Sequence, residues 1–199
     1  VKTGDGAGIL IQLPHDFLVE EASRLGFELP APGKYGVGME FFPCDKKVAN
    51  ACREVLKKNI MALGFELIGF RGVPVDHSVP GPDASEVEPV IEQVFVKLKA
   101  DSLTHEHLER KLFVLRNFTS HKIGRDVKGS NTEFYITSFS AKTIVYKGQL
   151  RTEQLRKYFF DLQDPRLRTA LALVHSRFST NTFPNWKLAQ PFRYIAHNG

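Results

Sequence analysis

Ala170-Leu-Ala-Leu-Val-His175-Ser-Arg177-Phe-Ser-Thr180-Asn-Thr182 is the stretch that decides how this chain is interpreted. Its first part, residues 170–174, is a short and nearly all-apolar run, which predicts a buried strand. A polar cluster begins directly after that strand. Arg177 gains little from packing in such a place, whereas its planar fork of donors suits a carboxylate.

A second apolar run, residues 192–196, precedes His197-Asn198-Gly199. A glycine backbone N–H next to an asparagine side-chain amide forms the donor pair that an oxyanion hole needs. A purely structural interpretation stays open for each of these residues. Asn-Gly is also the strongest signal for a type I′ hairpin turn, and Arg177 fits a surface ion pair. Thr180 fits a loop cap, and His175 fits a hydrogen-bonded structural histidine.

At these residues the chain resembles a known family, the glutaminase domain of the glutamate synthase large subunit. This domain is a class II glutamine amidotransferase. The resemblance spans nearly the whole chain, because further motifs match in the same order. These motifs are Thr3-Gly-Asp-Gly-Ala-Gly-Ile9, Arg71-Gly-Val-Pro74, Phe134-Tyr-Ile-x-Ser-x-Ser-x-Lys-Thr-Ile-Val-Tyr-Lys-Gly148 and the Phe-Pro-x-Trp that ends at Trp186.

The resemblance implies an α+β fold of the N-terminal-nucleophile hydrolase type, a four-layer αββα sandwich with antiparallel sheets. It implies one amidotransferase domain over residues 1–199, incomplete at both ends. By resemblance, Asn198 and Gly199 form the oxyanion hole, Arg177 binds the α-carboxylate of glutamine, and Thr180 helps to orient the substrate. The reaction implied is hydrolysis of glutamine to glutamate and ammonia through a thioester.

The chain departs from the family at the nucleophile, which is a cysteine at the mature N-terminus with its own α-amino group as base. This chain begins with Val1, and its two cysteines, Cys44 and Cys52, lie inside the sequence. Neither has a free α-amine. We therefore expect a fragment that begins after the nucleophile and is inactive alone. The alternative is a non-catalytic amidotransferase-like module that binds an amino acid or a partner domain.

Cofactors and partners follow from the resemblance alone. It implies FMN, an iron–sulfur cluster and transfer of ammonia to 2-oxoglutarate in the full enzyme, with no cofactor or metal bound by this fragment. The partners implied are glutamine and the synthase domains of the same polypeptide. A small reductase subunit is a further partner that the resemblance admits.

Composition and charge limit the classes of protein to which this chain can belong. The 199 residues are 42% hydrophobic, which is enough for one domain with a buried core. The net charge of +5 comes from 27 basic and 22 acidic residues that are mixed along the chain, so we expect no nucleic-acid partner. No apolar run is long enough for a membrane span. Two cysteines give no disulfide framework, which favours the cytoplasm.

Helices and strands alternate without a regular βαβ order, which favours α+β. The glycines of residues 4–8 predict a turn into a strand at 9–13, because neither a P-loop lysine nor a following helix is present. His105, His107 and His121 are expected in solvent rather than on zinc.

The expected helices are 15–25, 46–63 with Asp45 as N-cap and Cys52 in the core, 105–120 capped by Thr104, and 152–162. The expected strands are 34–43, 65–70 and 90–98, with a loop over 74–89 and a hairpin of 133–140 with 143–147.

Overall fold

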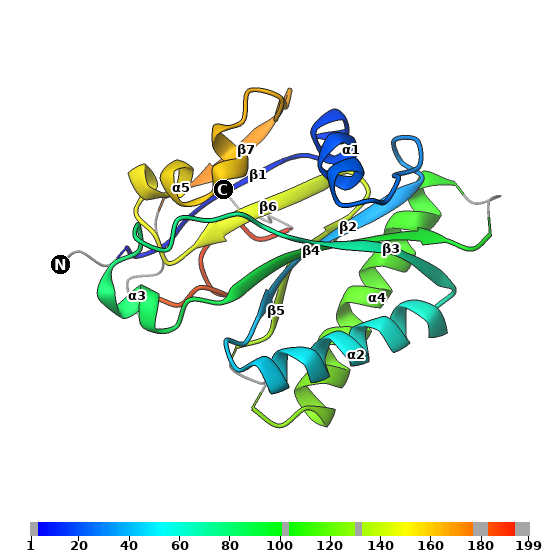
Figure 1. Ribbon diagram of the computed structural model, residues 1–199, viewed down its shortest axis with the longest axis horizontal. Helices are drawn as coiled ribbons and strands as arrows, with labels where there is room; N and C mark the ends of the chain where they lie inside the picture. The colour runs from blue at the N-terminus through cyan, green and yellow to red at the C-terminus, as the bar shows by residue number, and fades with distance from the viewer. Residues whose placement is uncertain (1–3, 101–103, 130–132, 177–182, 194–199) are drawn as a thin grey trace, which may run out of the picture.

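The fold is known from a computed structural model that describes residues 4–100, 104–129, 133–176 and 183–193. It is α+β and contains two antiparallel sheets (Figure 1). Four strands run in the order β3-β4-β2-β5 and three in the order β6-β1-β7. The strands are β1 Ala7–Gln12, β2 Tyr35–Phe42, β3 Phe65–Gly72, β4 Val90–Leu98, β5 Tyr135–Ser140, β6 Thr143–Gly148 and β7 Ala172–His175.

Two helices cover one face of the four-stranded sheet, and the three-stranded sheet lies on its other side (Figure 1). The covering helices are α2 Lys46–Ala62 and α4 His105–Asp126. The side chains of α1 His15–Arg24 and α5 Thr152–Tyr158 join the core on the opposite side of that sheet. The short α3 Pro82–Glu86 and the 3-10 turn η1 Phe160–Gln163 complete the described elements.

Strand β2 is apolar on both faces because both faces are covered by other parts of the fold. All eight of its residues are buried, since side chains alternate between the two faces of a strand and both faces are covered. Tyr35, Val37, Met39 and Phe41 pack in the core between the sheets, whereas Phe42 packs in the core under the helices. The four-stranded sheet is therefore the central layer.

The caps predicted for the two long helices are confirmed. Asp45 accepts from the backbone N–H groups of Lys47 and Val48, and Thr104 accepts from that of His107. Cys52 is fully buried, as its helical spacing predicts. Helix α4 continues to Asp126, beyond the predicted end at residue 120.

The predicted hairpin of residues 133–140 with 143–147 is wrong. The two strands exist, but β5 pairs with β2 in one sheet and β6 pairs with β1 in the other. Ala141-Lys142 therefore carries the chain from sheet to sheet. A two-residue link between two strands looks like a hairpin turn in sequence, and only the pairing partners separate the two cases.

Three smaller expectations also need correction. The loop at 74–89 contains α3, which begins with Pro82 at its first turn. The helix expected over 152–162 ends at Tyr158, where Phe159 takes an extended conformation before η1. Strand β7, expected to be buried, leaves Val174 57% exposed among the described residues.

Candidate active site

The segment before Arg177 is anchored at one end of the three-stranded sheet. In the antiparallel ladders, Gly8 of β1 lies opposite His175 of β7 and also opposite Lys147 of β6. Lys147, Gly8 and His175 thus form one row across the sheet. Directly opposed residues share a face, so their side-chain directions agree. The chain leaves β7 toward Arg177 at this row.

Residues 183–193, here called the strap, return to the same end of the sheet. Trp186 is 3% exposed and its indole N–H donates to the carbonyl of Ala84 at 2.9 Å. Its ring meets the ring of Phe41 edge-on, with centroids 6.2 Å apart, and lies 5.3 Å from that of Tyr158. This aromatic contact fixes the start of the strap in the core between the sheets.

The strap contacts β1 and β6 so closely that two strand positions must be glycine. A Cβ on Gly8 would lie 2.4 Å from the carbonyl oxygen of Gln190 and 2.8 Å from Cδ of Pro191. A Cβ on Gly148 would lie 2.5 Å from the ring of Trp186. Any side chain at either position would displace the strap from the sheet.

Arg193 ties the end of the strap to β5. Its Nη1 donates to the hydroxyl of Tyr135 at 3.2 Å and to the carbonyls of Ile136 at 3.1 Å and Thr137 at 2.9 Å. The guanidinium thus contacts three acceptors on β5 through one nitrogen. The strap is therefore held at both ends, immediately before the segment that contains Asn198 and Gly199.

Lys147 lies buried between the strap and β5. Its Nζ donates to the carbonyl of Lys187 at 2.8 Å. The same atom lies 4.7 Å from the ring centroid of Tyr135 and 4.6 Å from that of Phe192. Burial, with a smaller contribution from the charge of Arg193, lowers the pKa of Lys147 to about 7.

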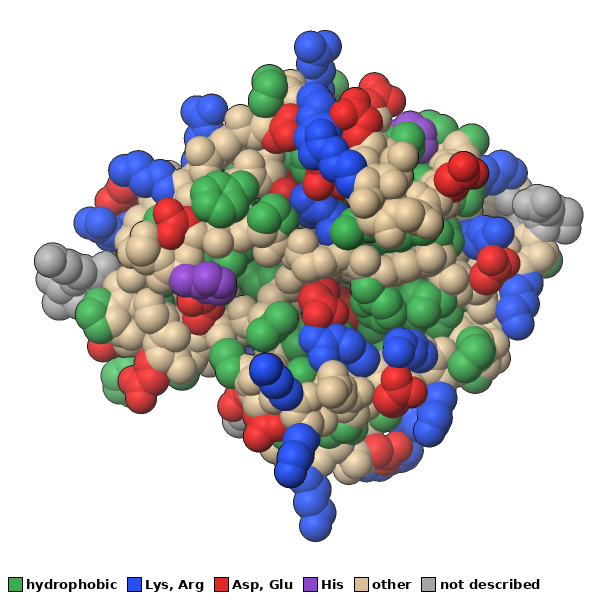
Figure 2. All heavy atoms as spheres, in the orientation of Figure 1, with side chains coloured by type: hydrophobic (Ala, Val, Ile, Leu, Met, Phe, Trp, Pro, Cys, Tyr) green, Lys and Arg blue, Asp and Glu red, His purple; other side chains and the backbone are tan. Residues whose placement is uncertain are grey.

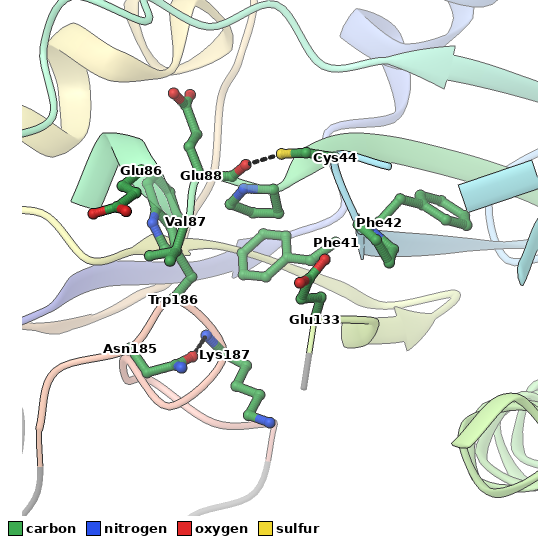
Figure 3. A pocket seen from close by; sticks show the side chains of 12 residues that line it. Phe41, Phe42, Cys44, Glu86, Val87, Glu88, Glu133, Asn185, Trp186 and Lys187 are labelled. Atoms are coloured by element: carbon green, nitrogen blue, oxygen red, sulfur yellow. Dashed lines mark hydrogen bonds between the residues drawn. The ribbon is translucent and has the colours of Figure 1, made fainter. Parts of the chain in front are cut away.

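A cavity of about 220 Å³ opens beside the start of the strap (Figure 3). Its centre is formed by apolar side chains, among them Phe41, Val87 and Trp186, while the carboxylates of Glu86 and Glu88 point away from it. The thiol of Cys44 donates to the backbone carbonyl of Glu88 at 2.7 Å.

Neither internal cysteine has the properties of an activated nucleophile. Burial raises the pKa of the Cys44 thiol, with further contributions from the charges of Glu133 and Glu88. Burial likewise raises the pKa of Cys52 to about 11. Reactive cysteines have a lowered pKa in an electropositive setting, so both of these thiols are protonated and unreactive at neutral pH.

The four site residues expected from the sequence, Arg177, Thr180, Asn198 and Gly199, lie outside the described residues. The structure describes what flanks them: β7 on one side and the strap on the other. Sequence reasoning missed the anchors Lys147 and Arg193. A signal for Lys147 exists in the sequence, since a lysine interrupts an apolar and β-branched run, but Lys147-Gly148 is also typical of the end of a strand.

The described residues contain no group of three or more His, Cys, Asp or Glu side chains that could hold a metal ion. An iron–sulfur cluster takes four thiolate or comparable ligands, and the whole sequence has two cysteines, so the residues present do not fit one. Among the described helices, none combines the length and apolarity needed to cross a membrane. Basic and acidic side chains interleave on the face shown in Figure 2.

Comparison with known proteins identifies the class. The family model for class II glutamine amidotransferases matches residues 1–199. The chain therefore belongs to the class II glutamine amidotransferases.

The following curated relatives are glutamate synthases. It is 42% identical over 206 residues to "Glutamate synthase [NADH]" of Schizosaccharomyces pombe, covering 100% of this chain and 9% of that protein. It is 40% identical to the "Glutamate synthase [NADPH] large chain" of Azospirillum brasilense, covering 100% of this chain and 13% of that protein. The "Glutamate synthase [NADPH] large chain" of Bacillus subtilis is 41% identical, and the match covers 99% of this chain and 13% of that protein. The chain thus spans about a tenth of the length of these relatives.

Proposed function

We propose that this chain is the glutaminase portion of a glutamate synthase, which hydrolyses glutamine to glutamate and ammonia. The observation that carries the proposal is the meeting of β7 and the strap at the row Lys147–Gly8–His175. The two motifs that the sequence marks as functional adjoin these two segments. An amidotransferase needs a carboxylate-binding arginine and oxyanion donors close together, and this chain course supports that arrangement.

In this proposal each site residue has one task. The guanidinium of Arg177 binds the α-carboxylate of glutamine in a two-pronged pair, and Thr180 orients the substrate. A cysteine N-terminal to this segment attacks the side-chain amide carbon, and its α-amine takes the thiol proton and passes it to the leaving ammonia. The Asn198 amide and the Gly199 backbone N–H stabilise the oxyanion that forms before the thioester. Water then hydrolyses the thioester, releases glutamate and frees the cysteine.

The rest of the catalytic cycle belongs, in this proposal, to other domains of the same polypeptide. Ammonia passes to 2-oxoglutarate there, with FMN and an iron–sulfur cluster as cofactors and a small reductase subunit as a further partner. The length of the curated relatives supports this division, since each is several times longer than this chain. We propose a cytoplasmic location, in keeping with two free cysteines.

The test compares two chains. The 199-residue chain alone should release no ammonia from glutamine, because no residue in it combines a thiol with a free α-amine. A chain extended upstream to the family's N-terminal cysteine should release ammonia, and changing that cysteine to serine should abolish the release. If the extended chain binds glutamine without hydrolysing it, the alternative of a non-catalytic module is correct. Ammonia release by the short chain that is lost on changing Cys44 or Cys52 to Ser would contradict the proposal.

A further inference from the structure

Lys147 occupies a position that is energetically unfavourable for a lysine. Its side chain is fully buried, and it forms no ion pair with any carboxylate in the described part of the chain. Burying an unpaired charge costs far more than burying a methylene chain, and a methionine of similar length would avoid that cost. Stability of the fold therefore gives no reason for a lysine here.

The contacts of Lys147 supply a reason for a lysine at this position. Its amino group donates to the carbonyl of Lys187 in the middle of the strap and lies against the ring of Phe192 near the end. It also lies against the ring of Tyr135, whose hydroxyl accepts from Arg193. One buried group thus joins the middle and the end of the strap to β5 and β6. An apolar side chain would fill the space but would leave the Lys187 carbonyl without this donor.

We propose that Lys147 is a positioning residue of the glutaminase: its Nζ holds the strap on the row Lys147–Gly8–His175 and so determines where the segment that carries Asn198 and Gly199 begins. This inference rests on the function proposed above. Oxyanion donors act through their distance to the developing charge, so a small displacement of their segment lowers the rate of the chemical step. Substrate binding through Arg177 depends on the other segment and should change little.

Burial sets the sign of the pH dependence of Lys147, and the charge of Arg193 adds to it. The charged and titratable groups around Lys147 are Tyr135 from β5, Arg193 from the strap, and His175 two strands away in the same row. The lowered pKa means that the buried position favours the neutral amine. Between about pH 7 and the ordinary lysine pKa of 10.5, the strap-bound form therefore gains stability as the pH rises.

The decisive variant is Lys147→Met in the extended, active chain, with Lys142→Met as its matched control. Lys142 is exposed in the link between β5 and β6, so the same substitution there removes the same charge. We expect Lys147→Met to lower kcat at least tenfold with the KM for glutamine changed less than twofold, while its melting temperature does not fall below that of the parent. Parental kcat per folded molecule, or a lower melting temperature as the only effect, would show a merely structural lysine and overturn the proposal.

A second readout needs no activity and therefore separates this inference from the proposed function. Trp186 is the one tryptophan of the chain and lies in the strap. In the 199-residue chain, acrylamide should quench its fluorescence at least twice as strongly in Lys147→Met as in the parent or in Lys142→Met. In the parent, quenching should decrease from pH 7 to pH 9, and in Lys147→Met it should not change. Equal quenching in all three chains would overturn the inference even if the extended chain is active.

A milder variant covers the case in which Lys147→Met does not fold, as judged by circular dichroism. Phe192→Leu keeps the lysine and removes one of its two rings, so the strap loses part of its attachment. We expect increased quenching of Trp186 and a lower kcat in the extended chain, with KM again nearly parental. If Phe192→Leu folds and both readouts are parental, the strap does not depend on these contacts and the proposal is wrong.

Discussion

Arg71 of β3 and Asp161 of η1 form a buried two-pronged ion pair, with Nη1–Oδ2 at 2.8 Å and Nη2–Oδ1 at 2.7 Å. The side chains are 4% and 2% exposed. The hydroxyl of Tyr146 donates to the same carboxylate at 2.9 Å, and Gln93 accepts from Arg71 at 3.1 Å. The arginine of the Arg71-Gly-Val-Pro74 motif thus joins the two sheets to η1, which is a structural role.

Removing the carboxylate should destabilise the fold strongly. Asp161→Ala leaves the buried Arg71 with Glu21, at 3.1 Å, as its one carboxylate partner in the described part of the chain, and breaking a buried pair in this way costs about 3–5 kcal/mol. Urea denaturation followed by circular dichroism measures the loss. Glu66→Ala is the control, because that carboxylate is 54% exposed and pairs with the partly exposed Lys97, so its loss should have little effect. Equal midpoints for the two variants would show that the buried pair contributes nothing.

Glu40 should make the protein less stable as the pH rises. It is fully buried on β2 and neither carboxylate oxygen has a hydrogen-bond partner among the described residues. Burial, and then the charge of Glu92, raises the pKa of Glu40 well above its usual value, against the opposing charge of Arg53. The folded state therefore holds this proton more tightly than the unfolded state does. The free energy of unfolding should fall by up to about 1.4 kcal/mol per pH unit above pH 4.5 until the raised pKa is reached.

The variant Glu40→Gln tests this prediction, since the amide keeps the shape and removes the charge. We expect it to be more stable than the parent at pH 7 and to lose the pH-dependent decrease. Denaturant titrations at pH 5 and pH 7 give both quantities. Glu54→Gln, on the exposed face of α2, should reproduce the parent. An unchanged pH dependence in Glu40→Gln would mean that another group causes it.

Arg177→Ala, in the chain extended to the N-terminal cysteine, should raise the KM for glutamine at least tenfold. A guanidinium–carboxylate pair contributes roughly 1.5–3 kcal/mol through charged hydrogen bonds. Arg177→Lys should restore binding only in part, because lysine lacks the planar fork. Arg168→Ala, exposed just before β7, is the control. Parental KM values for both Arg177 variants would make it a surface arginine.

Asn198→Ala should lower kcat by ~10²–10³ in the extended chain and leave KM nearly unchanged, because the oxyanion exists only beyond the ground state. The competing hypothesis is a hairpin turn that needs a positive φ, for which Asn198→Gly is harmless and Asn198→Ala costs only stability. Thermal melts and kcat on both variants separate the two. A normal kcat in a destabilised Asn198→Ala protein would refute the oxyanion role.

The sequence alone determined those helices and strands that depend on residues close together in the chain. Helix α2 is an example, since Asp45 caps it and Cys52 recurs on its buried face, so the pattern of a few turns contains the information. The amidotransferase family was also readable from motifs in order, as the family match confirms. Arg177, Thr180, Asn198 and Gly199 were found in the same way and stay predictions.

Only the tertiary structure decided which strands pair and what the buried polar groups do. The link at Ala141-Lys142 looks like a hairpin turn, but β5 and β6 find partners distant in sequence, because each sheet buries more apolar surface than a two-stranded ribbon would. Lys147 in the same way looked like the polar end of a strand. Its burial depends on the strap some 40 residues further on, and the carbonyl of Lys187 meets it only in the folded chain.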